Sequence, residues 1–294
     1  MKPAIFAYYD PASADEALDL MSRFGDQARP LAGGQSLVPL MNFRLVRPAH
    51  VIDLNRIGEL NGLEVENGWL RIGATARQRQ LEHSPEVAAG WPLLREAAGF
   101  IGHIQIRNRG TVGGSLAHAF PSAQLPVAMV TLETSLLLRS KSNERKVRAE
   151  EFFLGYMATA LQATELLIEI SVPPLPIHTG WAYQEVSRRH GDFALAGAAV
   201  VISLDTSGHI CHARLTLTGT VPWRAHEVET LLTGEAPGPP LFKEAARRAR
   251  ENVEQQSAIH ASAEYRRAAC EALAGRALAQ AAQRATALME GRSR

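Results

Sequence analysis

The chain has 294 residues, of which 46% are hydrophobic and 21% charged. This is the composition of a globular protein, and the length predicts two or three domains. Its 31 basic and 30 acidic residues give a net charge of +1, so no overall charge attracts nucleic acid or an anionic membrane. No apolar run reaches the roughly 18 residues of a membrane span, and the N-terminus does not read as a signal peptide. We therefore expect a cytoplasmic protein with no membrane span and no nucleic-acid partner.

The chain has only two cysteines, Cys211 and Cys270, and they lie far apart in the sequence. Neither belongs to a Cys-x-x-Cys motif. Two thiolates alone build neither a structural zinc site nor an iron–sulfur cluster. The sequence therefore predicts no metal site in this chain.

The N-terminal half alternates short strands and helices. Ser13 and Glu16 form a capping-box pattern that predicts a helix through Phe24. A short strand over residues 29–32 then runs into a glycine pair, after which Ser36 is expected to cap a helix over residues 37–42. We further expect strands at 51–54, 69–73, 135–139 and 165–172, helices at 75–82 and 92–99, and an irregular segment at 104–118.

A proline cluster at residues 173–176 marks the predicted boundary between two domains, 1–176 and 177–294. Beyond it, β-rich runs at 181–188, 194–204 and 210–217 predict a three-stranded antiparallel sheet. A helix at 223–232, a loop at 234–240 and long helices at 241–256 and 263–290 are expected to back that sheet. The predicted fold class is therefore α+β.

Two glycine pairs, Gly33-Gly34 and Gly113-Gly114, each lie just before a Ser-Leu dipeptide. Glycine permits positive φ and lets a ligand approach the backbone, and a helix N-terminus offers free N–H groups to phosphate. Two such turns could clamp a pyrophosphate through backbone N–H groups alone, although two ordinary turns would show the same pattern. Their flanks differ, so they are not a repeat. The sequence has neither a Gly-x-Gly-x-x-Gly after a strand nor a Gly-x4-Gly-Lys-Ser/Thr motif, which excludes Rossmann and P-loop nucleotide binding.

Three motifs in order carry a family resemblance over nearly the whole chain. They are AGGQSLVPLMNFRL at 32–45, RNRGTVGGSLAH at 107–118 and YQEVSRRHGDFAL at 183–195. Together they resemble the medium, FAD-binding subunit of the molybdenum hydroxylases, the carbon monoxide dehydrogenase and xanthine dehydrogenase superfamily. The resemblance implies an N-terminal FAD-binding domain of the p-cresol methylhydroxylase (PCMH) type, made of two α/β subdomains. It also implies a C-terminal domain like that of the carbon monoxide dehydrogenase flavoprotein.

The resemblance also implies which residues bind FAD. In the family both glycine turns wrap the FAD pyrophosphate, and the third motif lies near the flavin ring. Neither a catalytic proton-transfer residue nor a metal ligand is assigned. The residues expected to bind FAD are Leu31, Ala32, Gly33, Gly34, Gln35, Ser36, Leu37, Thr111, Val112, Gly113, Gly114, Ser115, Gln124, Leu167, Tyr183 and Glu185.

Four positions depart from the family pattern. Ser115 stands where Asn is usual, Phe120 where Asp is frequent, Gln124 where an acid is frequent and Glu185 where Lys is frequent. Each exchange alters a polar side chain and leaves the glycines intact. The departures therefore put single polar contacts in question and leave the backbone role of the turns unchanged.

The family acts in complexes of three subunits, so the resemblance implies two partners. A large subunit carries molybdopterin and a small one carries two 2Fe–2S clusters, and the expected assembly is a dimer of heterotrimers. Electrons pass through the clusters to FAD and on to an external acceptor, which the sequence does not identify. The cysteine count independently agrees that the clusters lie in another chain. The third motif is most similar to members that oxidise N-heterocyclic or aromatic compounds.

Two alternatives follow from the same residues. A stand-alone FAD-dependent oxidase would oxidise its substrate at the flavin without partners. A flavin-free assembly or scaffold subunit is supported only by the exchanges at Ser115, Phe120 and Gln124.

Overall fold

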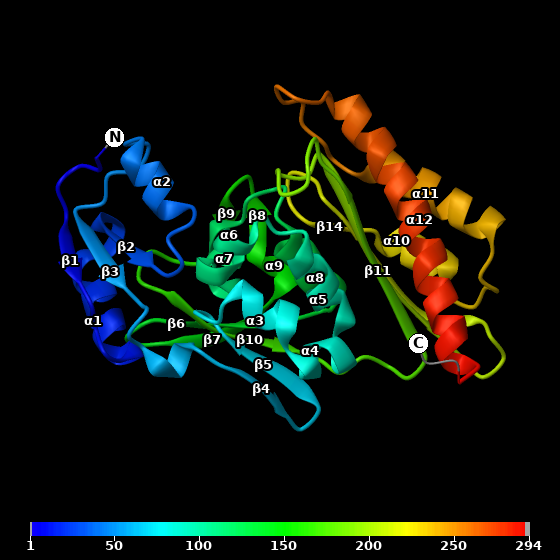
Figure 1. Ribbon diagram of the computed structural model, residues 1–294, viewed down its shortest axis with the longest axis horizontal. Coiled ribbons are helices and arrows are strands. Elements are labelled where there is room, and N and C mark those ends of the chain that lie inside the picture. The colour runs from blue at the N-terminus through cyan, green and yellow to red at the C-terminus, as the bar shows by residue number, and fades with distance from the viewer. Residues whose placement is uncertain (1, 292–294) are drawn as a thin grey trace.

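The computed structural model describes residues 2–291. Over these residues the chain forms a three-stranded, a five-stranded and a four-stranded sheet and a short hairpin. Figure 1 shows the three sheets following one another along the long axis of the molecule.

The elements before residue 176 build the first two sheets. The strands are β1 (Ala7–Tyr9), β2 (Ala28–Leu31), β3 (His50–Asp53), β4 (Leu63–Glu66), β5 (Trp69–Gly73), β6 (Ser135–Arg139), β7 (Glu144–Arg148), β8 (Phe153–Gly155), β9 (Ala158–Thr159) and β10 (Leu166–Val172). The helices are α1 (Ala14–Phe24), α2 (Leu37–Asn42), α3 (Gln78–His83), α4 (Pro85–Gly90), α5 (Pro92–Gly99), α6 (Ile104–Arg109), α7 (Val112–His118), α8 (Gln124–Thr131) and α9 (Ala149–Phe152), with 3-10 turns η1 (Gly25–Gln27) and η2 (Gly58–Leu60).

The remaining elements build the C-terminal lobe, the name used below for residues 179–290. They are strands β11 (Thr179–Val186), β12 (Ala196–Leu204), β13 (Ile210–Leu217) and β14 (Trp223–Arg224) and helices α10 (His226–Leu232), α11 (Pro239–Asn252) and α12 (Ala263–Met289). None of the helices that the structure describes is long and apolar enough to cross a membrane.

The first sheet is parallel, in the order β1-β3-β2, and α1 packs on it. Ser13 caps α1 by accepting a hydrogen bond from the Glu16 backbone N–H at 3.2 Å. The Glu16 carboxylate accepts from the Ala12 backbone N–H and does not close the reciprocal bond to Ser13. Strand β2 ends at Leu31, two residues before the first glycine pair.

The second sheet is antiparallel, in the order β4-β5-β10-β6-β7. Every residue of α8 is buried, because this helix lies between the second sheet and the C-terminal lobe. Helices α5 and α7 also pack against it, so the second glycine pair, at the start of α7, is held by the central core.

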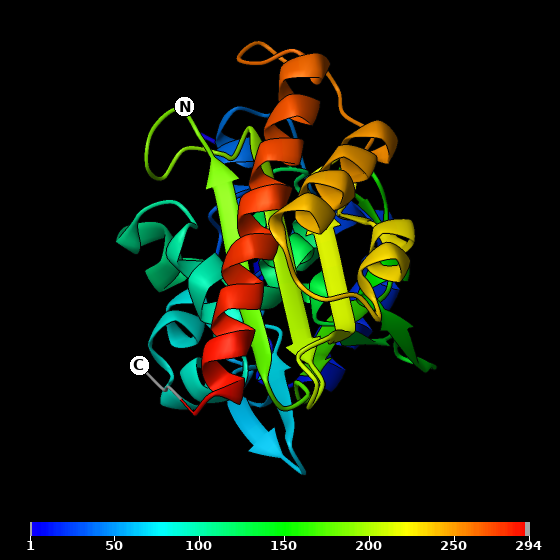
Figure 2. The ribbon, with the colours of Figure 1, turned by 90° about the vertical axis from the view of Figure 1, so that its right-hand side faces the viewer.

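The sheet of the C-terminal lobe separates two cores. Strand β12 is buried throughout, and its side chains alternate between the faces. Ala199 and Val201 join the central core, while Val200 and Ile202 join the core under α12. Figure 2 shows α11 and α12 covering the outer face. A Cβ on Gly180 would lie 1.9 Å from the Ala281 carbonyl oxygen, so glycine is required where α12 crosses β11.

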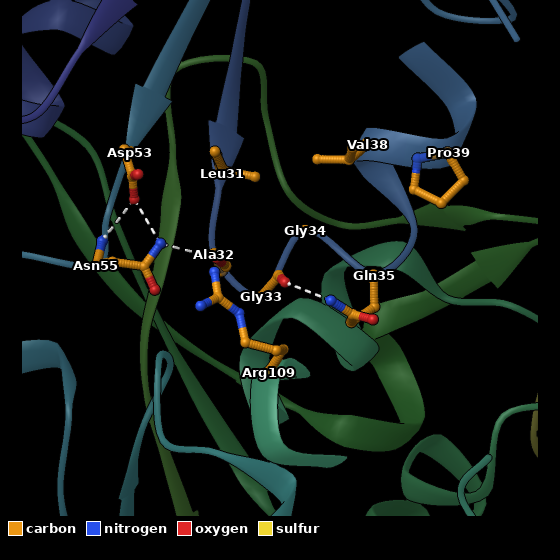
Figure 3. Close-up of a pocket in the computed structure, with 10 residues that line it drawn as sticks. All are labelled: Leu31, Ala32, Gly33, Gly34, Gln35, Val38, Pro39, Asp53, Asn55 and Arg109. Atoms are coloured by element: carbon orange, nitrogen blue, oxygen red, sulfur yellow. Dashed lines mark hydrogen bonds between the residues drawn. The ribbon is translucent and has the colours of Figure 1, made fainter. Parts of the chain in front are cut away.

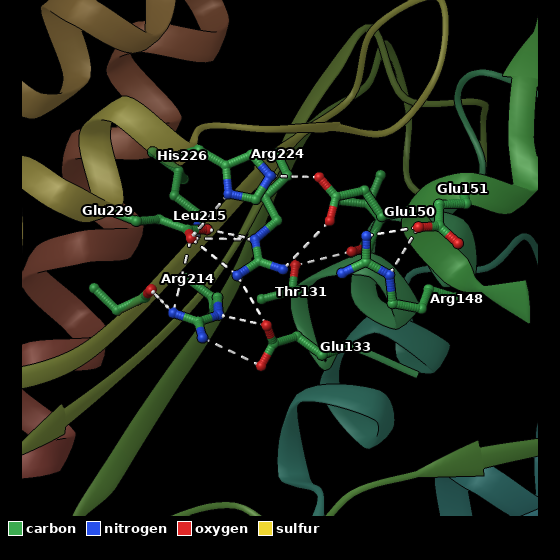
Figure 4. Close-up of polar contacts among 12 residues, drawn as sticks. Thr131, Glu133, Arg148, Glu150, Glu151, Arg214, Leu215, Arg224, His226 and Glu229 are labelled. Carbon is green, nitrogen blue, oxygen red and sulfur yellow. Dashed lines mark hydrogen bonds and ion pairs between the residues drawn. The ribbon is translucent and has the colours of Figure 1, made fainter. Parts of the chain in front are cut away.

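A network of charged side chains links the C-terminal lobe to the central sheet (Figure 4). The Arg224 side chain, 7% exposed, makes ion pairs with Glu229 of its own lobe and with Glu133 and Glu150 of the central part. Arg214 pairs with Glu133 at 3.0 Å. These partners come from both sides of the boundary, so the network connects the C-terminal lobe to the central part. Removing Arg224 would also leave the buried Glu229 without its closest cation, which is costly.

Most sequence predictions of regular structure are confirmed, several with identical bounds at 37–42, 69–73, 92–99, 135–139 and 210–217. The prediction of an irregular segment at 104–118 is wrong, since α6 and α7 occupy it. Glycines weaken helices when exposed, but Gly113 and Gly114 lie in the first turn of α7, where close packing outweighs their low helix propensity.

Three further predictions need correction. Ser36 does not cap α2 through its side chain, because its backbone is already in the right-handed helical region. The helix expected at 223–232 is instead the short strand β14 followed by α10, so β14 adds a fourth strand to the expected three. The helix expected from residue 75 begins at Gln78, after Arg77.

Candidate functional site

The first glycine turn joins β2 to α2 and presents unused backbone donors. Gly34 has φ +72°, and its carbonyl oxygen accepts a hydrogen bond from the Val38 N–H at 3.1 Å. The N–H groups of residues 33–37 find no acceptor among the described residues. Figure 3 shows the turn curling around an open space, with the Gln35 side chain donating to the Gly33 carbonyl oxygen at 3.1 Å. Successive free N–H groups around a left-handed residue form an anion-binding nest.

The two glycine segments are in direct contact. A Cβ on Gly33 would lie 2.4 Å from the Arg109 carbonyl oxygen and 2.8 Å from the Gly110 Cα. A Cβ on Gly114 would lie 3.8 Å from the Ala32 Cβ. Segments about eighty residues apart in the sequence are therefore packed so closely that position 33 has no space for a side chain.

The second glycine turn differs from the first because its backbone donors are already used. Thr111 caps α7 by accepting from the Gly114 N–H at 3.0 Å. The Val112 and Gly113 N–H groups donate to carbonyl oxygens of residues 76 and 74, and the Ser115 N–H donates to the Thr111 carbonyl oxygen. This segment therefore packs against the first turn, and its Ser115 hydroxyl makes no hydrogen bond to any described residue. We expected both turns to present backbone donors, and only the first does so.

A pocket of about 320 Å³ opens at the first turn. Its walls combine apolar side chains with a few polar groups, as nucleotide sites generally do. Among the residues at 31–37, Ser36 and Leu37 are absent from the lining. The lining residues are Leu31, Ala32, Gly33, Gly34, Gln35, Val38, Pro39, Asp53, Asn55 and Arg109.

Asn55 and Arg77 hold the pocket together. The Asn55 side-chain amide donates to the Ala32 carbonyl oxygen at 2.9 Å and to Asp53 at 2.5 Å. Arg77 donates to the Asn55 Oδ1 at 2.6 Å and to the Arg109 carbonyl oxygen at 2.5 Å, so it bridges both glycine segments. Burial, and then the nearby charge of Arg109, lower the pKa of Arg77. Arg109 and the acidic Asp53 both line the pocket, so the free N–H groups of the first turn are the main feature that suits the pocket to an anionic group such as a pyrophosphate.

A second set of predicted residues gathers at the boundary between α8 and the C-terminal lobe. Glu185 accepts hydrogen bonds from the Gln124 amide at 3.0 Å and from the Tyr183 hydroxyl at 3.2 Å. Burial raises the pKa of Glu185 to about 7, although both hydrogen bonds act in the opposite direction. Leu167 is buried on β10 in the same core as Tyr183 and does not line the pocket.

Aromatic side chains lie near the far end of α7. The Phe120 and Phe193 ring centroids are 4.5 Å apart, and Phe193 is 69% exposed. His118 stacks on Phe120 at a centroid distance of 6.1 Å. Exposed aromatic faces of this kind offer a surface on which a planar ring can stack.

The structure thus divides the predicted site residues into two groups. Residues 31–35 line the pocket, and the segment 111–115 packs against this turn without lining the pocket. Gln124, Tyr183 and Glu185 form the second cluster, and Leu167 lies in the same core as Tyr183. Sequence reasoning missed Asn55 and Arg77. Asn55 follows the end of β3, and a polar residue directly after a parallel strand was the available signal. Over the described residues, no group of three or more His, Cys, Asp or Glu side chains could hold a metal ion.

Comparison with known proteins adds independent findings. Residues 4–175 match the family described as the FAD binding domain in molybdopterin dehydrogenase. Residues 181–281 match the CO dehydrogenase flavoprotein C-terminal domain.

Individual relatives agree with both matches. The chain is 40% identical to caffeine dehydrogenase subunit beta of Pseudomonas sp. strain CBB1, with 97% of each chain covered. It is 42% identical to the carbon monoxide dehydrogenase medium chain of Hydrogenophaga pseudoflava, with 76% of this chain and 77% of that one covered. A solved structure of the H. pseudoflava carbon monoxide dehydrogenase lacking the Mo-pyranopterin moiety of its cofactor superposes with a TM-score of 0.94 at 39% identity, covering 97% of this chain and 99% of that one.

Proposed function

The chain belongs to the family of FAD-binding medium subunits of the molybdenum hydroxylases, and from that membership we propose that it is the electron-transfer subunit of a heterotrimeric enzyme of this kind. In this proposal it receives electrons from 2Fe–2S clusters in a small partner subunit and passes them to an external acceptor. A large partner subunit carries the molybdopterin and oxidises the substrate. FAD supplies the chemistry that the position requires, since it accepts electrons singly and releases them in pairs.

The observation that carries the proposal is the free backbone N–H groups of residues 33–37 beside the close contact of Gly33 with Arg109. These groups would bind the FAD pyrophosphate, with the Ser115 hydroxyl as a further donor. Arg109 would offset part of the pyrophosphate charge. The residues present therefore fit the cofactor that the family carries.

The second cluster would lie at the flavin end of the cofactor. Leu167 and Tyr183 would pack near the ring, and Gln124 and Glu185 would face it with polar atoms. The exposed ring of Phe193 would close that end against solvent.

The two cysteines support the division of labour between subunits. Cys211 is exposed and Cys270 is buried, and neither is disulfide-bonded. Two thiols alone do not complete the four ligands of a 2Fe–2S cluster, so we propose that the electron donor is a separate chain. We place the complex in the cytoplasm as a dimer of heterotrimers, with domains 1–176 and 177–294 in this subunit.

The substrate class that we propose is N-heterocyclic or aromatic compounds. A relative of similar length is a subunit of a caffeine dehydrogenase, and caffeine is an N-heterocycle. The choice belongs to the large partner subunit, whose pocket contacts the substrate.

Purification of the tagged chain after co-expression with its candidate partners tests the proposal. We expect flavin absorption bands together with a molybdenum subunit and an iron–sulfur subunit in stoichiometric amounts. A monomer that oxidises a substrate unaided would support the stand-alone oxidase instead. A chain without flavin bands even after FAD addition would support the scaffold alternative.

A further inference from the structure

Glu185 is a half-buried carboxylate whose hydrogen-bond partners are both neutral. Its Oε2 accepts from the Gln124 amide and from the Tyr183 hydroxyl, and it forms no ion pair with any residue from 2 to 291. Gln124 is itself fixed by a hydrogen bond from its amide to the Phe100 carbonyl oxygen at 3.4 Å. Burial disfavours the charged form of a carboxylate, and no cation among the described residues offsets that cost, so the protonated form is favoured although both donors act in the opposite direction.

The charged groups on the surrounding elements are paired with groups other than Glu185. On α5, Glu96 accepts from Arg284 of α12 at 2.7 Å and from the Tyr183 backbone N–H at 3.3 Å. Arg266 of α12 donates to the Leu195 carbonyl oxygen, next to β12. On β11, Gln184 points to the opposite face and pairs with Gln280. Burial raises the pKa of Glu185 to about 7, and the two hydrogen bonds act in the opposite direction.

The chain leads from the second glycine turn to the Glu185 cluster. Helix α7 starts at that turn, and its seven residues span roughly 10 Å at 1.5 Å per residue. Phe120, in contact with Phe193, follows α7, and Gln124, which donates to Glu185, begins α8. In the proposed function the pyrophosphate lies at Gly33 and the flavin ring stacks on Phe193, on the side that leads to Gln124 and Glu185.

The electron supply creates a need for a protonatable group. A 2Fe–2S donor delivers electrons singly and without protons, so each reduction adds negative charge to the cofactor site. In a medium of low dielectric constant that charge is stabilised when a neighbouring group takes up a proton.

We propose that Glu185 takes up one proton from solvent when the flavin of this subunit is reduced, an inference that rests on the proposed function. Two electrons enter from the one-electron donor, and one proton binds a carboxylate oxygen of Glu185, in addition to any proton that the flavin itself takes. On reoxidation the electrons leave to the acceptor and Glu185 returns its proton to solvent. No bond forms between the cofactor and the protein.

Proton uptake by Glu185 makes the flavin midpoint potential depend on pH in a predictable direction. Below about pH 7 Glu185 is protonated in both redox states, and it contributes no further proton. Above that pH it is ionised beside the oxidised flavin and protonated beside the reduced one. The flavin midpoint potential should therefore fall more steeply with pH above about pH 7, by about 30 mV per pH unit for one proton per two electrons.

A spectroelectrochemical titration of the purified FAD-loaded complex over a range of pH tests this inference. The wild-type complex should show the steeper slope above about pH 7, and the FAD-loaded Glu185→Gln complex should show a single shallow slope. Glu96→Gln is the matched control, because Glu96 lies at the same boundary but is paired with Arg284, and it should keep the wild-type slope. Reduced-minus-oxidised infrared spectra should show a protonated-carboxyl band that Glu185→Gln lacks.

A second variant, Gln124→Leu, keeps the inference testable if Glu185→Gln does not fold. Gln124→Leu removes a hydrogen bond that lowers the pKa of Glu185, so the change of slope should move to higher pH. The role of Glu185 would be overturned if wild type and Glu185→Gln had equal slopes, or if the slope changed at the same pH in Gln124→Leu as in wild type. Either result would leave the proposal of FAD binding intact. A wild-type complex that binds no FAD would instead remove the proposed function and this inference together.

Discussion

A side chain at position 33 would begin 2.4 Å from the carbonyl oxygen of Arg109. That oxygen also accepts a hydrogen bond from Arg77, which in turn holds Asn55. The first glycine turn is thus fixed against the start of the second by packing and by a chain of polar contacts. The pocket between them keeps its free backbone donors in place because neither segment can move alone.

Asn55→Leu should weaken FAD binding about tenfold. The substitution removes the amide that donates to the Ala32 carbonyl oxygen and leaves Arg77 without one of its acceptors, and lost polar contacts of this kind cost about 1–3 kcal/mol. Fluorescence-quenching titration with FAD measures the effect. Asn143→Leu, in the exposed turn between β6 and β7, is the control and should bind FAD as wild type does. An unchanged affinity in Asn55→Leu would show that Asn55 does not support the pocket.

Arg224→Met should lower the free energy of unfolding by about 3 kcal/mol. It leaves the nearly buried Glu229 without its closest cation, and removing one partner of a buried pair is costly. Urea denaturation measures the loss. Arg248→Met, which breaks a solvent-exposed pair with Glu244, should change the free energy of unfolding far less. If both variants lost the same amount, the boundary network would not be a major source of stability.

Glu185 should make the FAD-free chain less stable at higher pH. Its pKa is raised to about 7 in the folded chain, so between its ordinary pKa and about pH 7 the unfolded chain is ionised while the folded chain stays protonated. Stability therefore falls as pH rises through this window. Glu185→Gln should match wild type near pH 4.5 and exceed it near pH 8, by up to about 3 kcal/mol. Urea denaturation midpoints of wild type and Glu185→Gln at the two pH values measure this difference. Equal stability of the two proteins at the higher pH would contradict the burial of an uncompensated carboxylate.

Two substitutions in the second glycine segment test separately how its shape and its polar side chain contribute to FAD binding. Gly114→Val would place a Cβ 2.5 Å from the Thr111 Oγ1, which breaks the cap of α7 and pushes the wall toward Ala32. We expect it to lose FAD. Ser115→Asn restores the residue that the family usually carries, and we expect equal or tighter binding. Equilibrium dialysis with FAD measures both affinities. FAD retention by Gly114→Val would show that the second segment does not form a wall of the site.

Local sequence signals predicted much of the fold. The Ser13 cap, the alternating pattern of β5 and the proline at the start of α5 are short-range features, and these elements appear at or within a residue of the expected bounds. The segment at 104–118 was misread because its glycines argue locally against helix. Packing of α7 on the central sheet overrides that preference, and such packing depends on residues distant in the sequence.

The candidate site was predictable only in part, for the same physical reason. The glycine motifs and the family resemblance named both groups of residues. Sequence alone could not show that the Gly113 N–H is used by the Ala74 carbonyl oxygen, nor that Arg77 reaches across to Arg109. Both facts arise from strand and helix packing between segments that are not neighbours along the chain.

The most direct measurement of FAD binding at the first glycine turn compares two alanine variants by FAD titration. Gly33→Ala places a methyl group against the Arg109 carbonyl oxygen, whereas Gly99→Ala, at the end of α5, meets no atom within 4 Å. With both variants folded by circular dichroism, Gly33→Ala should bind FAD at least tenfold more weakly than wild type, and Gly99→Ala should bind it equally. Wild-type affinity in Gly33→Ala would contradict the placement of the pyrophosphate at this turn.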